Sequence, residues 1–173
     1  LSFIDSDFGE EDKLIDAISN ALVQLNKMRI SEGKLLHKDL NSRIKIMKKD
    51  LTRIEKLSHK MPKSKLKDLK KKISSIIDQD SLDQGRLMQE VAYLIERSDV
   101  TEEIVRANIH LDNFIQYLKY DDPVGKRLNF LIQEINREIN TIGSKSPVHD
   151  VTTKIVEMKN EIEKVREQVQ NIL

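Results

Sequence analysis

The sequence predicts an all-α protein, an antiparallel helical bundle from which a long basic helical hairpin projects. Three observations support this fold class. The 173 residues include only 5 Gly and 3 Pro, so few residues interrupt a helix. Charged residues make up 34% of the chain, and Lys, Glu, Ile and Leu are abundant, as in helical proteins. Apolar residues recur at steps of three and four almost throughout, which is the spacing of one helix face.

The first predicted helix is long. Apolar residues keep helical spacing from Leu14 to Met28, and the pattern resumes at Leu36 and continues to Met61. No proline precedes Pro62, so we expect one helix of about 70 Å, at a rise of 1.5 Å per residue. A short return helix is expected from residue 66 to residue 76.

Capping residues mark the starts of the later helices. Ser81 with Gln84 predicts a helix that runs to about residue 97, and Asp99 with Glu102 predicts one that runs to about residue 119. Asp122 as the cap, with Pro123 at the first helical position, predicts a helix that Gly143 ends.

The last predicted helix begins at Ser146-Pro147 and carries an uninterrupted heptad seam. Its apolar residues alternate steps of four and three, a pattern that packs against neighbouring helices. The seam comprises Val151, Ile155, Met158, Ile162, Val165, Val169 and Ile172.

Basic residues are concentrated in one segment. Between Arg43 and Lys72 there are 13 basic and three acidic residues, a net charge of +10, and the rest of the chain sums to −9. We expect residues 43–80 to form a mobile, lysine-rich hairpin, and residues 1–42 and 81–173 to form the bundle. Such segregated charge favours a polyanion-binding arm. A lysine-rich solvated helix surface explains the same charge without a ligand.

Composition excludes several kinds of site. The chain has no Cys, which rules out thiolate zinc sites, disulfides and Cys nucleophiles, and suits a reducing compartment such as the cytoplasm. No apolar run approaches membrane-spanning length. The aromatic content of 4% is too low for base stacking to dominate nucleic-acid binding. Because the chain starts at Leu1 and not at Met, we expect it to be a fragment of a longer protein.

The segment from Gly125 to Lys145 carries two kinds of residues. Its Leu and Ile residues form a buried stripe, and polar residues occupy both the edge of that stripe and the opposite face. The polar residues are unusually rich in Asn, Gln, Arg and Thr, which suits hydrogen bonding to a partner more than solubility alone. Along the edge lie Arg127, Glu134, Glu138, Thr141 and Lys145, and on the far face Asn129, Gln133, Asn136, Arg137 and Asn140.

The predicted helix after Asp99 carries a second row of polar residues that could face those of the segment from Gly125 to Lys145. Glu103, His110 and Tyr117 recur every seven residues beside its apolar stripe, with Arg106 next to them. If the two helices pack antiparallel, as their short connection predicts, Glu103 and His110 face Glu134 and Glu138. Carboxylates with an imidazole suit Mg²⁺ or Mn²⁺, and Arg and Lys suit phosphate. Ion pairs between the helices and a packed or exposed histidine account for the same residues without a metal.

Three segments carry a resemblance to a known family. The stretches SDVTEEIVRANIHLDNF, PVGKRLNFLIQEINREINTIGSKS and EIEKVREQVQNI closely resemble the C-terminal region of the bacterial YicC/YloC family. Upstream, Arg29-x-x-Glu32-Gly33-x-x-Leu36 is similar to that family's R-x-x-E-G motif. The resemblance implies a stress-related, metal-dependent endoribonuclease that assembles as a hexamer around RNA, and that has an N-terminal domain not present in this chain.

The resemblance also implies the roles of individual residues. Glu103, His110, Glu134 and Glu138 are expected to be catalytic and to bind a divalent Mg or Mn ion. By this resemblance, the residues expected to bind RNA are Arg106, Arg127, Arg137, Asn140 and Lys145. The local positive charge, and not the resemblance, adds Lys70, Lys71 and Lys72 of the basic segment. The alternative function is a non-catalytic helical module that binds RNA or protein, in which the polar stripe is an assembly surface.

Overall fold

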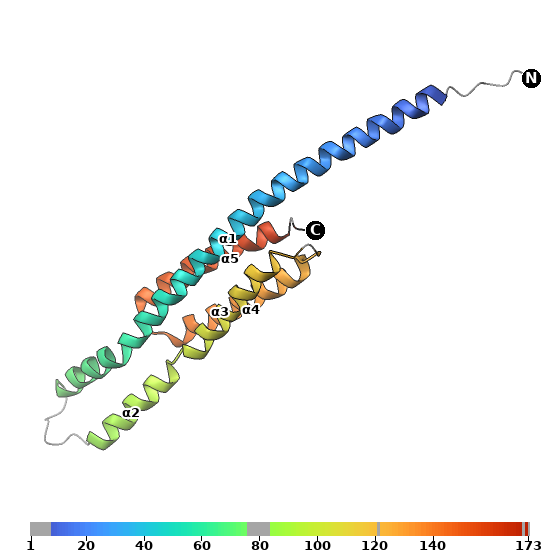
Figure 1. Ribbon diagram of the computed structural model, residues 1–173. Helices are drawn as coiled ribbons and strands as arrows, with labels where there is room; N and C mark the ends of the chain where they lie inside the picture. Colours follow the sequence, from blue (N-terminus) through green and yellow to red (C-terminus); the bar gives the residue numbers. More distant parts are fainter. Residues whose placement is uncertain (1–7, 76–83, 121, 171, 173) are drawn as a thin grey trace, which may run out of the picture. The chain divides into compact units, whose positions relative to one another are not determined.

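The computed structural model describes residues 8–75, 84–120, 122–170 and 172. Helices account for nearly all of these residues, and no strand occurs within them, so the predicted all-α fold is confirmed. The predicted cap at Ser81 lies outside the described residues. The five helices are α1 (Phe8–Ser74), α2 (Gln84–Arg97), α3 (Thr101–Tyr117), α4 (Gly125–Lys145) and α5 (His149–Val169), as Figure 1 shows.

The chain divides into two compact units, residues 1–39 and 40–173. In the described part of the first unit, large apolar residues such as Leu14, Leu25 and Met28 are exposed. Within the second unit, α1 buries its apolar residues from Leu40 to Ile54, so residues 43–54 of the basic segment belong to the bundle. In this region α1 alternates its basic residues with a buried apolar face.

Ion pairs fix α1 against α5 within the second unit. Arg43 Nη1 lies 2.9 Å from Glu161 Oε2, and Lys154 Nζ lies 3.6 Å from Asp50 Oδ1. As the residue number rises in α1, it falls in α5, so the two helices are antiparallel. The heptad residues of α5 from Val151 to Val169 are buried, as their spacing predicts. Ile172, which follows the helix, is only partly buried.

The core of the bundle is aliphatic with one phenylalanine. Its largest fully buried side chains come from α1, α3, α4 and α5, and each of these retains less than 2% of its accessible surface. Burying side chains of this size removes the apolar surface that holds a helical bundle together. These residues are Phe114, Leu40, Ile44, Met47, Leu51, Ile54, Leu111, Leu128, Ile135, Ile139, Ile142 and Met158.

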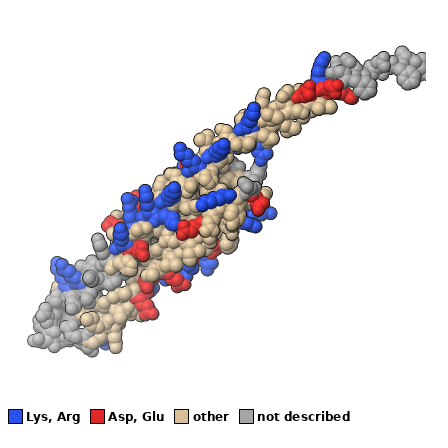
Figure 2. Space-filling model, viewed as in Figure 1, with Lys and Arg blue, Asp and Glu red and all other residues tan. Residues whose placement is uncertain are grey.

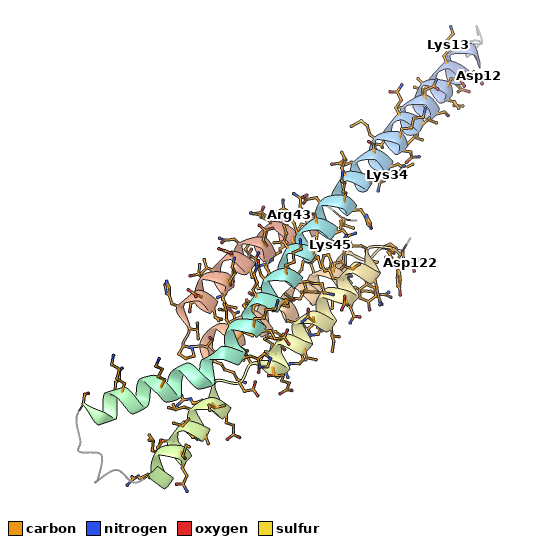
Figure 3. The ribbon with its side chains drawn as sticks, turned by 60° about the vertical axis from the view of Figure 1, so that its left-hand side comes forward. Asp12, Lys13, Lys34, Arg43, Lys45 and Asp122 are labelled. Atoms are coloured by element: carbon orange, nitrogen blue, oxygen red, sulfur yellow. The ribbon has the colours of Figure 1, made fainter. Side chains whose placement is uncertain are left out.

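Pro62 does not end the first helix, contrary to the prediction. α1 continues through it to Ser74, so the expected separate return helix is the last part of α1. A proline inside a helix removes one backbone hydrogen bond and its ring clashes with the preceding turn, which bends the helix. The ribbon of α1 changes direction in its last third, as Figure 3 shows.

Two glycines of α4 allow close approach between segments. Gly143 lies within α4 and does not end it. A Cβ at this position would lie 3.2 Å from Ile155 Cγ2 of α5. Gly125, not Pro123, begins α4, and a Cβ there would lie only 2.8 Å from the carbonyl oxygen of Ile172. Both glycines therefore serve packing against the C-terminal part of the chain. Among the described helices, none is long and apolar enough to cross a membrane.

Candidate functional site

The line of polar side chains along which α3 meets α4, here called the groove, has a uniform antiparallel register. Arg106 Nε donates to Glu138 Oε1 at 3.0 Å, and the guanidinium of Arg127 lies 5.6 Å from the ring centroid of Tyr117. The two contacts are 11 residues apart along α3 and 11 apart along α4. Each step along α3 therefore matches one step back along α4. The predicted antiparallel pairing is present.

Five charged residues form an ion-pair network at one end of this groove: Glu102, Glu103, Arg106, Glu138 and Lys145. Arg106 binds both carboxylate oxygens of Glu138 at 3.0 Å, through Nε and Nη2. Lys145 Nζ donates to Glu103 Oε1 at 2.9 Å, and Arg106 Nη2 donates to the same oxygen at 3.3 Å. Glu103 and Glu138 are both buried. Bidentate, charge-assisted hydrogen bonds of this kind hold their partners in one geometry.

The network sets the protonation of its members. Burial raises the pKa of Glu103, but the hydrogen bond from Lys145 and the nearby charge of Arg106 outweigh it, so that the pKa lies below its usual value. The hydrogen bond to Glu138 raises the pKa of Arg106. Hydrogen bonds from the Thr101 hydroxyl and backbone lower the pKa of Asp99, whose carbonyl oxygen also accepts from Lys145 at 3.2 Å. All three groups are therefore ionised near neutral pH.

His110 and Glu134 occupy the next level of the groove. His110 follows Arg106 by four residues and Glu134 precedes Glu138 by four, so the register puts them opposite each other. The closest cation to Glu134 is Arg137, with its Nη1 4.0 Å from Oε2. His110 is half-buried and makes no hydrogen bond to any described residue. Of the four predicted catalytic residues, these two are the ones not held by the network.

The residues predicted to bind RNA fall into three groups. Arg106 and Lys145 belong to the network, so their charges are matched by buried carboxylates. Arg127, Arg137 and Asn140 are exposed along α4, with Arg127 against the ring of Tyr117. Lys71 and Lys72 are exposed near the end of α1, and the side chain of Lys70 lies outside the described residues.

Further basic side chains gather over α1 and α5. Figure 2 shows Lys and Arg side chains grouped over the bundle part of these helices. On α1 the exposed ones are Lys45, Lys49, Arg53 and Lys56. Much of the predicted basic hairpin is thus the outer face of a bundle helix. Figure 3 labels Arg43 and Lys45 on this part of α1.

The groove offers few ligands for a divalent ion. Within the described residues, no three His, Asp or Glu side chains are close enough together to hold one. Glu103 and Glu138 are paired with cations, which leaves Glu134 and His110. Mg²⁺ in proteins commonly takes one or two carboxylates and completes its shell with water and substrate phosphates. These two residues do not form a closed protein cage for an ion.

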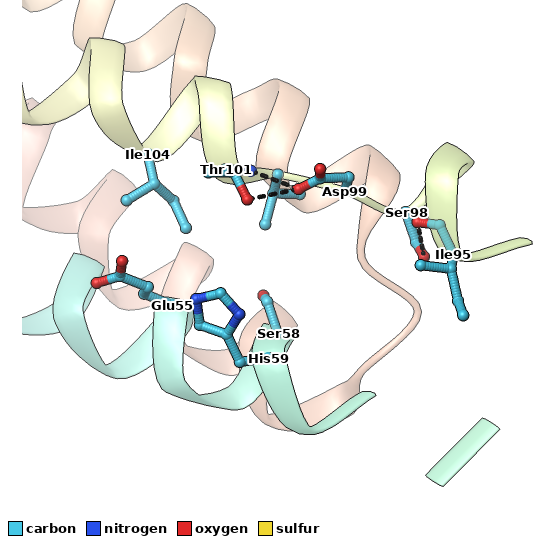
Figure 4. A pocket seen from close by; sticks show the side chains of 9 residues that line it. Glu55, Ser58, His59, Ile95, Ser98, Asp99, Thr101 and Ile104 are labelled. Atoms are coloured by element: carbon cyan, nitrogen blue, oxygen red, sulfur yellow. Dashed lines mark hydrogen bonds between the residues drawn. The ribbon is translucent and has the colours of Figure 1, made fainter. Parts of the chain in front are cut away.

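A cavity at the N-terminal end of α3, here called the base of α3, was not predicted from the sequence. It has a volume of about 240 Å³ and is lined by Glu55, Ser58 and His59 of α1, and by residues around the α2–α3 connection. Figure 4 shows these side chains facing Thr101 and Ile104. The spacing of three and four residues from Glu55 to Ser58 and His59 is a helix-face signal. Its other wall comes from residues about 40 positions later, which no local pattern links to α1.

The fold and the groove define a class: an all-helical bundle with a polar, charge-paired groove between two antiparallel helices. Comparison with known proteins specifies the family. Residues 54–173 match the family model described as Endoribonuclease YicC-like, C-terminal. The chain belongs to this family, as the three resembling segments predicted.

Two curated relatives match nearly the whole chain. A protein of Clostridioides difficile (strain 630) named "Probable endoribonuclease YicC" is 43% identical over 160 residues, which cover 92% of this chain and 55% of the relative. A protein of Haemophilus influenzae with the same name is 34% identical over 160 residues, with the same coverage. The chain therefore spans about half the length of the curated relatives it matches.

Proposed function

We propose that the full-length protein is an endoribonuclease in which the α3–α4 groove contacts the scissile region of RNA. The observation that carries the proposal is that two of the four candidate catalytic residues belong to the ion-pair network and two do not. Arg106 and Lys145 hold Glu103 and Glu138 in place, and Glu134 and His110 lie at the neighbouring level outside this network, with Arg137 4.0 Å from Glu134. Membership of an endoribonuclease family supports this assignment.

Each group has a distinct part in this proposal. The network fixes the carboxylates of Glu103 and Glu138, which holds α3 and α4 in register and positions Glu134 and His110. Arg127 and Arg137, exposed on α4, bind phosphates on either side of them. A divalent Mg or Mn ion, held by Glu134 and His110 together with RNA phosphate oxygens, would supply a Lewis acid and activate water.

Basic residues outside the groove attract the RNA. Exposed Lys and Arg residues of α1, including Lys45 and Lys49 of the bundle and Lys71 and Lys72 near its end, provide positive charge that is independent of sequence. Hexameric assembly, a role in stress and a cytoplasmic location stay predictions for the full-length protein.

The decisive experiment is Glu134→Gln in the full-length protein. We expect RNA binding and thermal stability to be unchanged and the cleavage rate to fall at least about a hundredfold, as when a transition-state charge stabiliser is lost. The matched control is Glu163→Gln on α5. Its Arg166 partner lies 3.9 Å away at the same three-residue spacing, close to the 4.0 Å of the Glu134 pair. Full cleavage activity in a folded Glu134→Gln, Glu138→Gln double variant would contradict the proposal.

The network itself favours a second candidate function. Charged groups that pair with one another are a common structural device at helix interfaces, and they need no substrate. In that case the groove is part of a non-catalytic module that binds RNA or protein. Glu134→Gln would then leave cleavage per folded molecule intact and, at most, lower the thermal stability.

A further inference from the structure

The cavity at the base of α3 combines an apolar floor with a polar rim. Ile95, Val100 and Ile104 supply the floor, and Val100 and Ile104 are almost fully buried. Glu55, Ser58 and His59 supply the rim from α1. Its volume of about 240 Å³ is below the range typical of sites for drug-sized ligands, so it suits a flat group of the size of one nucleobase or nucleoside.

Two polar groups of the rim lack partners. The Oγ atom of Ser58 is buried and has no hydrogen-bond partner among the described residues. The carboxylate of Glu55 makes no hydrogen bond or ion pair within the same part of the chain. By contrast, Asp99 on the opposite wall is satisfied by the backbone and hydroxyl of Thr101. A buried hydroxyl without a partner is uncommon in folded proteins, and it indicates that something else completes the site.

We propose that this cavity binds one unpaired guanine base of RNA, an inference that rests on the proposed ribonuclease function. An ionised carboxylate only accepts hydrogen bonds, and its two oxygens match a pair of adjacent donors. Guanine presents such a pair, N1–H and the N2 amino group, on its Watson–Crick edge. Adenine, cytosine and uracil each present a single donor group there. Glu55 is the acceptor, Ser58 bonds a further edge atom, and the apolar floor and the His59 ring cover the faces of the base.

The cavity is next to the groove. Asp99 lines the cavity, and its carbonyl oxygen accepts from Lys145 Nζ, which also donates to Glu103 of the network. A strand of RNA that follows α4 therefore passes from the exposed arginines to the cavity within the same unit. A base bound there would fix the position of the chain relative to Glu134 and His110. The preferred cleavage position would then be set relative to a guanine.

The test uses the full-length protein and the four 5′-nucleoside monophosphates, with binding measured by isothermal titration calorimetry. We expect 5′-GMP to bind most tightly. Glu55→Gln should weaken 5′-GMP binding at least about tenfold, the size of one bidentate base contact, and leave the other three within about twofold. Ser58→Ala should weaken 5′-GMP binding by a smaller factor. The control, Glu163→Gln, removes an exposed carboxylate of α5 and should change nothing.

Cleavage mapping separates this inference from the proposed function. If 5′-GMP binds as expected and RNA is not cleaved, the cavity assignment holds and the ribonuclease assignment is wrong. If RNA is cleaved by the wild type and by Glu55→Gln with the same base preference, the ribonuclease assignment holds and the cavity assignment is wrong. Equal binding of all four monophosphates also overturns the cavity assignment.

Discussion

Replacing Lys145 by Met tests the network most directly. Methionine keeps a flexible apolar stem and removes the ammonium that donates to Glu103 at 2.9 Å. Glu103 retains only 5% of its side-chain surface, and its Oε2 already lacks a partner among the described residues. Arg106 alone would then hold this carboxylate, at 3.3 Å.

The expected loss of stability follows from these contacts. A hydrogen bond to a charged group contributes about 1.5–3 kcal/mol, and removing one partner of a buried pair costs about 3–5 kcal/mol. Because Lys145 keeps 37% of its side-chain surface and Arg106 stays in place, we expect the loss to lie near the low end of the first range. We expect a loss of about 2 kcal/mol, or about 4–8 °C in Tm for a unit of this size.

The pH dependence gives an independent check. The pKa of Glu103 is lowered in the folded state, so its stabilising effect is present above the unfolded value and is lost as the pH falls through the folded value. The difference in Tm between wild type and Lys145→Met should be full at about pH 7 and should shrink as the pH falls through the lowered folded value. Thermal unfolding followed by circular dichroism over a series of acidic pH values measures it.

Two controls complete this experiment. Lys164→Met removes an exposed lysine that lies 2.7 Å from Glu161 on α5, and it should cost much less because both groups are better solvated. Adding Glu103→Met to Lys145→Met should recover stability, since an apolar pair replaces a buried charge. A Tm for Lys145→Met within about 1 °C of wild type at neutral pH would refute the reasoning, because it implies a loss well below the calculated one.

Two further predictions concern packing and RNA binding. Gly125→Ala should lower the free energy of unfolding by about 1–3 kcal/mol in urea titrations, because its Cβ would meet a carbonyl oxygen at 2.8 Å. Gly33→Ala, where a Cβ meets nothing within 4 Å, should be neutral or stabilising; equal effects would count against the packing argument. Changing Lys70–Lys72 to Gln should weaken binding of all RNA sequences about equally and reduce its salt dependence, and an unchanged salt slope would contradict this.

Long periodic segments of the sequence predicted most of the fold. The α5 seam from Val151 to Val169 is buried as expected, because seven-residue repeats report a contact face whatever the partner is. Single residues that usually end a helix were less informative. Pro62 and Gly143 predict helix ends, but α1 and α4 continue through these positions. The apolar spacing from Leu14 to Met28 predicted a helix correctly, yet spacing does not specify what covers it.

The candidate site was predicted in part for a related reason. Helical spacing selected Glu103, His110, Glu134 and Glu138 and their facing walls, and the short connection gave the antiparallel direction. Spacing alone does not decide whether a carboxylate meets a cation or a ligand. That choice depends on where the long side chains of Arg106 and Lys145 end, which only three-dimensional packing determines.

The equal spacing of contacts along α3 and α4 limits how this part of the chain can change length. A single residue inserted into either helix would rotate every following side chain by about 100° and separate each pair beyond it. An insertion in the connection between Leu118 and Val124 would leave all the pairs intact. Related sequences should therefore vary in length between the two helices and keep a constant number of residues from Glu103 to Tyr117 and from Arg127 to Lys145.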